Sequence, residues 1–158
     1  MKTNRRIIRE KVLQVLYAFE LNGEGLTFLT DGILTDVQNL TDIEFAKELI
    51  NKVVANRKNY DEEIKKRVSN WEIERIALID KILLMMGMAE ISAFPDIPPK
   101  VSINEAIEIA KEYSTSNSGK FINGILDSYL SDLKKDGKLK KAGRGLIDES
   151  LTKKSGNE

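Results

Sequence analysis

Residues 71–93 form the most apolar stretch of this chain and restrict its possible folds more than any other segment. Apolar side chains occur on nearly every side of a helix drawn through them, and the longest uninterrupted apolar run is residues 82–89. A helix that is apolar all round is normally buried at the centre of a bundle. The run of eight residues is far shorter than the ~20 residues needed to cross a bilayer. The segment therefore predicts a buried central helix that ends before Pro95.

Helix-period patterns also dominate the rest of the chain, whereas the alternation typical of strands is poor. We expect a first helix at about residues 4–21 and a short helix within 26–38. Capping boxes at 41–44 and 102–105 each predict the start of a helix. Another helix follows the break at 56–59, and the last one ends near residue 133. Gly124, inside the last of these, is expected to permit close approach of another helix. The sequence thus predicts an all-α chain of about seven helices.

The predicted helices form one domain, residues 1–133, in two halves of about three helices each, about 1–70 and 71–133. Residues 134–158 are rich in Gly, Lys and Ser and contain few apolar side chains. Such a composition cannot bury enough apolar surface to fold. These residues are therefore predicted to form a flexible basic tail.

Charge is distributed unevenly, although the formal net charge of the whole chain is zero. Residues 1–11 carry a net charge of +4, residues 12–133 a net charge of −8, and residues 134–158 again +4. The sequence therefore predicts a polarised molecule with basic ends and an acidic middle.

Neither cysteine nor histidine occurs in the chain. This excludes thiolate metal sites, cysteine nucleophiles and imidazole bases, and no acidic spacing resembles a calcium loop. We expect no cofactor and no metal, although composition leaves a carboxylate-only metal site open. The first residues lack the apolar core of a secretory signal, and no segment is long enough to span a membrane, so the predicted location is the cytoplasm.

The first predicted helix carries four basic residues along one side, about a quarter turn from its apolar stripe: Lys2, Arg5, Arg6 and Arg9. We call these four residues the basic strip. Basic side chains at a helix N-terminus oppose the helix dipole, so their presence there needs another cause. Arginine pairs with phosphate and stacks on bases, so RNA binding is one interpretation of the strip. The alternative is a solvated charged face without a partner.

Three stretches form an ordered pattern over residues 4–133: RRIIREKVLQVLYA at 5–18, ERIALIDKILLMMGMAEI at 74–91, and IPPKVSINEAIEIAKEYSTSNSGKFINGILD at 97–127. Together they resemble the NusB family of transcription antitermination factors. The resemblance implies an all-helical fold of two packed three-helix subdomains. It also implies a non-enzymatic adaptor that binds boxA-type single-stranded RNA with NusE, a ribosomal protein of the small subunit. This pair acts on the elongating RNA polymerase complex, notably on ribosomal RNA operons.

The resemblance also implies which residues contact RNA. Three strip residues match the family's arginine-rich motif, and two residues of the last helix match its RNA surface: Arg5, Arg6, Arg9, Lys120 and Phe121. Lys2 joins them by charge alone. By periodicity Phe121 lies at the margin of an apolar stripe, where boundary packing is the alternative to base stacking. Asn117 stands where many members carry an acid, and the role of that position is left open.

Glu74 and Asp80 match positions at which the family meets NusE, and the acidic middle of the chain is expected to attract a basic partner. Without the resemblance, both acids are expected to be solvated. A helical scaffold without specific RNA recognition is the alternative function, and a homodimer through the basic helix is a further possibility. RNA cytosine methyltransferases also contain NusB-like domains, but this chain has neither their cofactor domain nor a cysteine.

Overall fold

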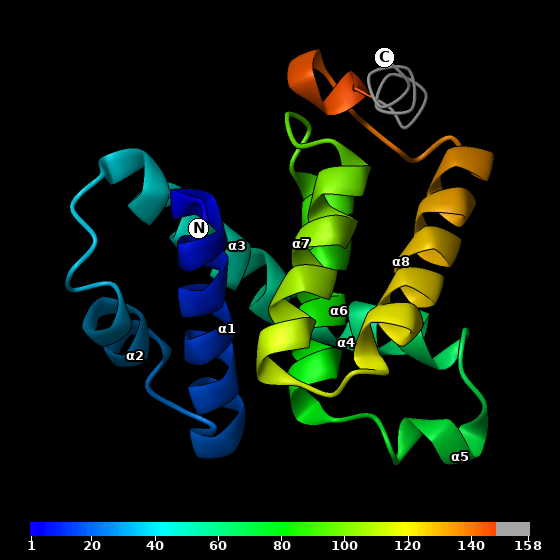
Figure 1. Cartoon of the computed structure of the whole chain (residues 1–158), viewed down its shortest axis with the longest axis horizontal. Helices are drawn as coiled ribbons and strands as arrows, with labels where there is room; N and C mark the ends of the chain where they lie inside the picture. Colours follow the sequence, from blue (N-terminus) through cyan, green and yellow to red (C-terminus); the bar gives the residue numbers. More distant parts are fainter. Residues whose placement is uncertain (148–158) are drawn as a thin grey trace.

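The computed structural model describes residues 1–147, and all regular structure in this part is helical (Figure 1). The helices are α1 (Asn4–Asn22), α2 (Leu26–Ile33), α3 (Leu40–Ala55), α4 (Arg57–Lys65), α5 (Asn70–Ile73), α6 (Leu78–Ala93), α7 (Pro99–Tyr113), α8 (Ser118–Lys135) and the short 3-10 helix η1 (Gly143–Leu146). α5 is a single turn, so the seven longer α-helices match the predicted number, and the all-α prediction is confirmed. Within residues 1–147, no helix has both the length and the apolarity needed to cross a membrane.

α6 is the central helix of the molecule. It packs against α1, α3, α4, α7 and α8. Its side chains Leu83, Leu84, Met88 and Ile91 are fully buried. The predicted buried central helix is therefore present, although it begins at Leu78 rather than near residue 71.

The start of the predicted central helix is wrong because a separate turn forms upstream. Ser69 and Glu72 form a capping box, in which the Glu72 carboxylate accepts a hydrogen bond from the Ser69 backbone N–H at 3.0 Å. This pair starts α5, which ends at Ile73. The backbone then leaves the helical region, and Ala77 is extended at the cap of α6. Residues 74–77 thus form a short link between two helices.

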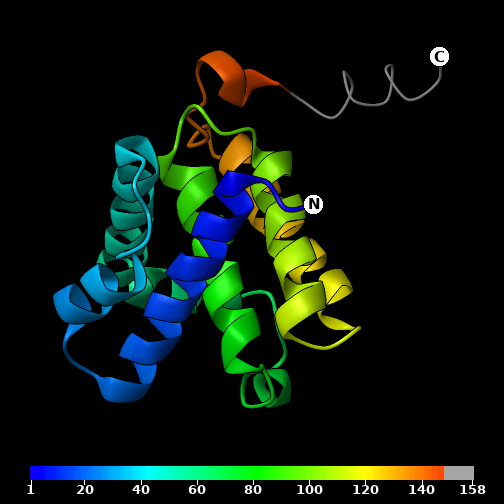
Figure 2. The ribbon, with the colours of Figure 1, turned by 60° about the vertical axis from the view of Figure 1, so that its left-hand side comes forward.

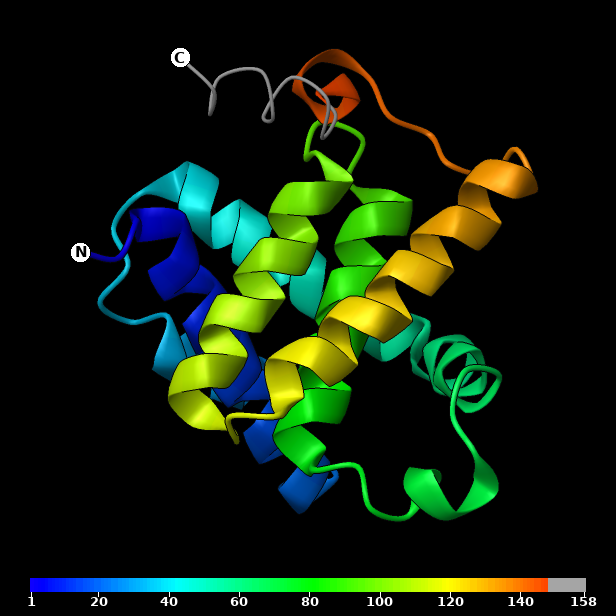
Figure 3. The same cartoon turned by 45° about the vertical axis from the view of Figure 1, so that its right-hand side comes forward.

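Two groups of three helices pack on each other. α1 packs against α2 and α3, while α7 and α8 pack against each other and against α6. Figure 3 shows α7 and α8 in front of α6, with the N-terminal helices beside and behind them. Because α1 and α3 also contact α6, the apolar side chains of both groups form one continuous core. The two packed three-helix subdomains implied by the resemblance are therefore observed.

Both capping boxes predicted from the sequence are wrong. α3 begins one residue before the predicted cap Thr41, because the Asn39 side chain accepts a hydrogen bond from the Asp42 backbone N–H at 3.1 Å. α7 begins at Pro99, so the predicted cap Ser102 lies inside the helix. In each case a stronger start signal lies upstream, and the predicted residues are free for other contacts.

The glycine that permits close helix approach is Gly87 of α6, not Gly124 of α8. A Cβ at Gly87 would lie 2.6 Å from the Cδ1 atom of Leu126, whereas a Cβ at Gly124 would meet no described atom within 4 Å. Gly87 is buried where α6 meets α8. The prediction for Gly124 is wrong because that residue lies on the exposed side of its helix.

Residues 138–147, which we call the C-terminal strap, lie against the turn between α6 and α7 (Figure 2). Lys141 Nζ donates hydrogen bonds to the carbonyl oxygens of Glu90, at 3.1 Å, and Phe94, at 2.8 Å. The Ala142 N–H donates to the Pro95 carbonyl at 3.0 Å. The region expected to be a flexible tail therefore has tertiary contacts within residues 141–145, because Lys141 caps the end of α6. Residues 148–158 of the predicted tail lie outside the described residues.

Candidate functional site

The basic strip lies at the start of α1, next to α7 (Figure 3). Thr3 caps this helix: its side chain accepts a hydrogen bond from the Arg6 backbone N–H at 3.1 Å. All four cations of the strip have a carboxylate oxygen within 4 Å. The strip is therefore matched by acids of the same molecule, and is not an isolated positive face.

Two strip cations bind acids of α7. Lys2 Nζ lies 2.7 Å from Glu112 Oε2 and 2.9 Å from Glu10 Oε1, and the hydrogen bonds to Glu112 and Glu10 raise the pKa of the Lys2 amine. Arg6 donates from Nε and Nη2 to the two oxygens of Glu105, at 2.7 and 3.1 Å, and this pairing raises the pKa of its guanidinium. Both side chains keep about a third of their surface or somewhat less in solvent. An external anion can therefore reach both cations.

Arg5 has a different environment. Its guanidinium carbon lies 4.0 Å from the centroid of the Phe45 ring, and its Nε lies 3.9 Å from Asp42 Oδ1. A cation over an aromatic face gains about 0.5–1 kcal/mol at an exposed site. Arg5 is thus held in place by a ring and only weakly paired with an acid, and it remains partly exposed.

Arg9 differs from the other strip residues because it is buried. Its Nε and Nη2 donate to the two oxygens of Glu90 at 2.9 and 2.7 Å, and Ser102 Oγ donates to Glu90 Oε1 at 3.0 Å. Burial opposes the charge, but the attraction of Glu90 and its hydrogen bonds raise the pKa of the Arg9 guanidinium. With 4% of its side chain exposed, Arg9 offers no surface to a ligand in this conformation.

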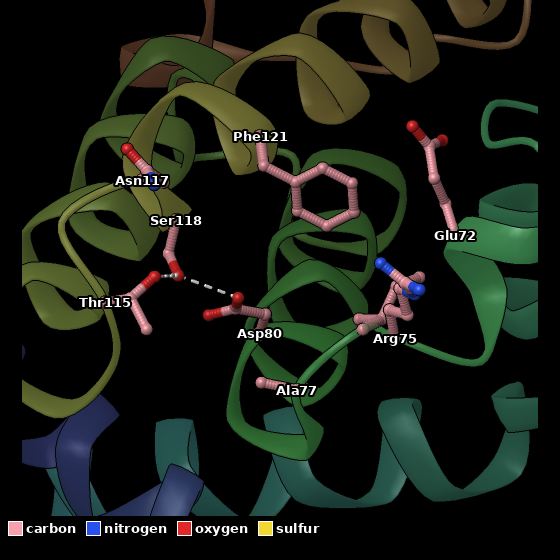
Figure 4. Close-up of a pocket in the computed structure, with 9 residues that line it drawn as sticks. Glu72, Arg75, Ala77, Asp80, Thr115, Asn117, Ser118 and Phe121 are labelled. Carbon is pink, nitrogen blue, oxygen red and sulfur yellow. Dashed lines mark hydrogen bonds between the residues drawn. The ribbon is translucent and has the colours of Figure 1, made fainter.

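A pocket of about 290 Å³ lies where α5, the start of α6 and the start of α8 meet (Figure 4). The Phe121 ring projects over it, and the Ser118 hydroxyl donates to Asp80 Oδ2 at 2.8 Å. This hydrogen bond ties the first residue of α8 to the first turn of α6. The pocket is lined by Glu72, Arg75, Ile76, Ala77, Asp80, Thr115, Asn117, Ser118 and Phe121.

The structure brings two of the predicted site residues, Asp80 and Phe121, together in this pocket. Asp80 is 7% exposed, so the expectation that it is a solvated acid is wrong. Its carboxylate accepts a hydrogen bond from the Ser118 hydroxyl and is thereby held in a buried position. Phe121 is half-buried: part of its ring packs against the core, and part is open to solvent. Lys120 and Glu74 are exposed, and neither lines the pocket.

Sequence reasoning missed the acids that pair with the strip. Glu105 was interpreted as part of a capping box, and Glu112 was not singled out. A signal was present, because Glu105, Glu108 and Glu112 follow one another at spacings of three and four and so share one side of a helix. Such an acidic stripe indicates a partner helix with basic side chains, and α1 is that helix.

A smaller apolar hollow of about 140 Å³ lies between α1, the start of α6 and the end of α7. It is lined by Leu13, Gln14, Tyr17, Ile79 and Tyr113. Tyr17 and Tyr113 keep more than a third of their surface exposed. No group of three or more potential metal-ligating side chains occurs in the described part of the chain.

The fold and these sites define a small helical bundle with a charged helix face and an adjoining pocket. The family model described as "NusB family" matches residues 6–131. The chain belongs to the NusB family.

Individual relatives agree with this assignment. The transcription antitermination protein NusB of Chloroherpeton thalassium is 47% identical over 150 residues, which cover 94% of this chain and 71% of the relative. NusB of Salinibacter ruber is 44% identical over 147 residues, which cover 92% of each chain.

Solved structures show the same fold. T. maritima NusB has a TM-score of 0.76 and 36% identity, covering 84% of this chain and 94% of that chain. A structure of the antitermination factors NusB and NusE in complex with dsRNA has a TM-score of 0.74 and 26% identity, covering 84% of this chain and 99% of that chain.

Proposed function

We propose that this chain is a transcription antitermination adaptor that binds RNA together with NusE. The observation that carries the proposal is the match over nearly the whole chain to proteins named for antitermination. A structure of similar fold contains NusB, NusE and RNA together. More specifically, we propose boxA-type single-stranded RNA of ribosomal RNA transcripts as the ligand and the elongating RNA polymerase complex as the site of action, in the cytoplasm and without enzymatic activity.

The proposed RNA face combines the strip with the start of α8. Lys2, Arg5 and Arg6 are charged and partly exposed, so they suit the phosphate backbone. Phe121 offers an aromatic surface for an unpaired base, and the exposed Lys120 next to it suits a phosphate. α7 connects these two parts, because it carries two of the acids that pair with the strip and leads directly into the pocket-lining residues.

Arg9 has a supporting role in this proposal. Its buried pair with Glu90 joins α1 to α6, so it fixes the orientation of the helix that presents the other cations. The predicted contact between Arg9 and RNA thus becomes a positioning role, because the side chain is 96% covered.

The proposed NusE face lies around the start of α6. Glu74 is exposed there, and Asp80 lies nearby at the edge of the pocket. The apolar hollow beside Tyr17 adjoins the same end of α6, because Ile79 lines it. The exposed Glu74 carboxylate near an apolar hollow suits a basic protein, because the charge attracts it and apolar contacts hold it.

A structural scaffold is the second candidate function. The observation that favours it is that all four strip cations already pair with acids of the same chain. A homodimer through α1 remains a prediction.

A titration of fluorescent boxA RNA, with and without NusE, tests the adaptor proposal. We expect NusE to tighten binding and Arg5→Ala/Arg6→Ala to weaken it at least about tenfold, since a hydrogen bond to a charged group contributes about 1.5–3 kcal/mol. Phe121→Ala should weaken binding by a similar factor. The matched control is Lys52→Ala/Lys58→Ala, which removes two exposed charges from α3 and α4. Equal affinities for the parent, the arginine variant and the control would support the scaffold instead.

A further inference from the structure

We infer that Glu105 and Glu112 of α7 are specificity-determining residues that compete with RNA phosphates for the cations of α1. They weaken binding to nucleic acids that offer charge alone. Binding to an RNA that also contacts other parts of the surface is largely unaffected. The inference rests on the proposed function, because it concerns how the same face selects its RNA.

The geometry of the two pairs matches that of a bound phosphate. Arg6 meets Glu105 with two nearly parallel hydrogen bonds, at 2.7 and 3.1 Å, which is the fork arrangement that arginine also forms with phosphate. Lys2 Nζ lies 2.7 Å from Glu112 Oε2. Each carboxylate therefore occupies the position that a phosphate oxygen needs.

The acids are arranged to serve both cations from one helix. Glu105 and Glu112 are seven residues apart on α7, which is about two turns, so they point to the same side. α7 packs beside α1 over this region. The competing charges are thus fixed to the fold and are present at a high local concentration, independent of the salt in solution.

Stability does not explain the pair of Lys2 with Glu112. Lys2 and Glu112 have 36% and 47% of their side chains exposed, and exposed ion pairs contribute about 0–1 kcal/mol. Basic residues in the first turn are also unfavourable for α1 itself. The acids of α7 offset the positive charge at the start of α1. Uncharged residues in place of both the cation and its acid would also remove the unfavourable charge, and fewer long side chains would have to be ordered.

Competition makes the charge of the strip selective. A phosphate that displaces Glu105 exchanges one charge-assisted pair for another, so the net gain is small. The displaced carboxylate then repels the incoming backbone. RNA that also stacks a base on Phe121 or contacts NusE gains enough to complete the exchange, whereas a random polyanion does not.

The salt dependence should show the same effect. Three or four open cations on single-stranded RNA give a slope of log affinity against log salt of about −2 to −3. In the parent protein each freed carboxylate takes up a cation from solution, and this partly cancels the counterions that RNA releases. We therefore expect a shallower slope for the parent than for a variant without the two acids.

The test compares Glu105→Gln, Glu112→Gln and their double variant with the parent, using boxA RNA and a scrambled single strand of equal length. The control Glu48→Gln/Glu62→Gln makes the same change of net charge at exposed positions of α3 and α4. We expect the double variant to bind scrambled RNA about tenfold tighter, with a steeper salt slope, and boxA RNA only a few-fold tighter. The control should change neither affinity by more than about twofold.

The outcomes separate the inference from the proposed function. If the parent binds boxA RNA but the double variant binds scrambled RNA no tighter than the control does, the competition is absent and only the inference fails. If no version binds RNA with or without NusE, the proposed function and the inference both fail. Glu112→Gln alone changes a half-exposed side chain, so it keeps the test valid if Glu105→Gln impairs folding. Equal unfolding midpoints for the parent and the variants would exclude a merely structural effect.

Discussion

Arg9 of α1 and Glu90 of α6 form a two-point ion pair inside the core, although 81 positions separate them in the chain. Only 4% and 3% of the two side chains are exposed, and Ser102 donates a further hydrogen bond to Glu90. The pair joins the first helix to the central one. Both carboxylate oxygens of Glu90 accept hydrogen bonds, so little hydrogen-bonding capacity of this buried acid is unmet.

Removal of one partner of this pair should strongly destabilise the protein. We expect Arg9→Met to lower the free energy of unfolding by about 3–5 kcal/mol, because Glu90 is left charged and buried. The double variant Arg9→Met/Glu90→Met should recover most of this loss, since the isolated charge is gone. Urea denaturation of the parent, both single variants and the double variant provides the measurement. A loss below about 1 kcal/mol in Arg9→Met would contradict the buried-pair description.

Gly87 and Gly124 provide a matched pair of helix glycines with opposite expectations. Gly87→Ala should destabilise the protein by about 1–3 kcal/mol, because its Cβ meets the fully buried Leu126 side chain. Gly124→Ala should stabilise it by about 0.5–1 kcal/mol, since alanine restricts the unfolded chain and nothing described lies near its Cβ. Thermal unfolding of the two variants checks the sign of each effect. Equal shifts would show that α6 and α8 do not meet closely at Gly87.

The acid limb of the stability curve should depend on Glu63 of α4. Burial alone would raise the pKa of this carboxyl, but hydrogen bonds from Arg67 and Lys66 outweigh it and lower the pKa below the ordinary 4.5. The stabilisation is therefore fully present above pH 4.5 and is lost as the pH falls through the lower folded-state pKa. Glu63→Gln should cost about 1 kcal/mol at pH 7, and the difference from the parent should shrink as the pH falls below 4.5.

Measured free energies of unfolding between pH 3 and pH 7 test this dependence. Glu62→Gln, an exposed neighbour on the same helix, is the control and should keep the slope of the parent. Parallel curves for the parent and Glu63→Gln would rule out the contribution of the Glu63 carboxylate.

The strap contributes to stability through Lys141. Its amine donates to two carbonyl oxygens at the end of α6, where the helix dipole also favours a cation. We expect Lys141→Ala to lower the free energy of unfolding by about 1 kcal/mol. Lys140→Ala, an exposed neighbour, should have no measurable effect in the same denaturation experiment. An indistinguishable pair of variants would mean that the strap is not held by this cap.

Helix positions were predicted well where one apolar stripe decides them. The apolar stripe of the first helix predicts five inward residues: Ile8, Val12, Val15, Leu16 and Phe19. The first four are buried and Phe19 is half-buried, and Gly23 ends that helix in a left-handed conformation. Helix starts were predicted less well. Asn39 caps α3 although Thr41 fits the capping pattern, because the pattern of Thr and Glu three residues apart is also compatible with a helix interior.

The candidate site shows the limit of helix periodicity. At 100° per residue, Arg9 shares a side with Lys2, Arg5 and Arg6, so the four residues form one strip in the sequence. Only the position of α6 distinguishes Arg9, because it brings Glu90 over that residue and leaves the others at the edge. Contacts between residues so far apart in the chain depend on how the helices cross, which no single helix determines.

Three of the acids that pair with the strip are synthesised later than the strip itself. During synthesis α1 leaves the ribosome well before α6 and α7, which carry Glu90, Glu105 and Glu112. A nascent chain that ends before α6 already contains Glu10 and Asp42, which pair with Lys2 and Arg5, but it lacks the three acids that pair with Arg6 and Arg9 and complete the pairing of Lys2. Docking of α6 and α7 supplies these three carboxylates, so the charge of the strip is matched in full only once the chain has folded through α7.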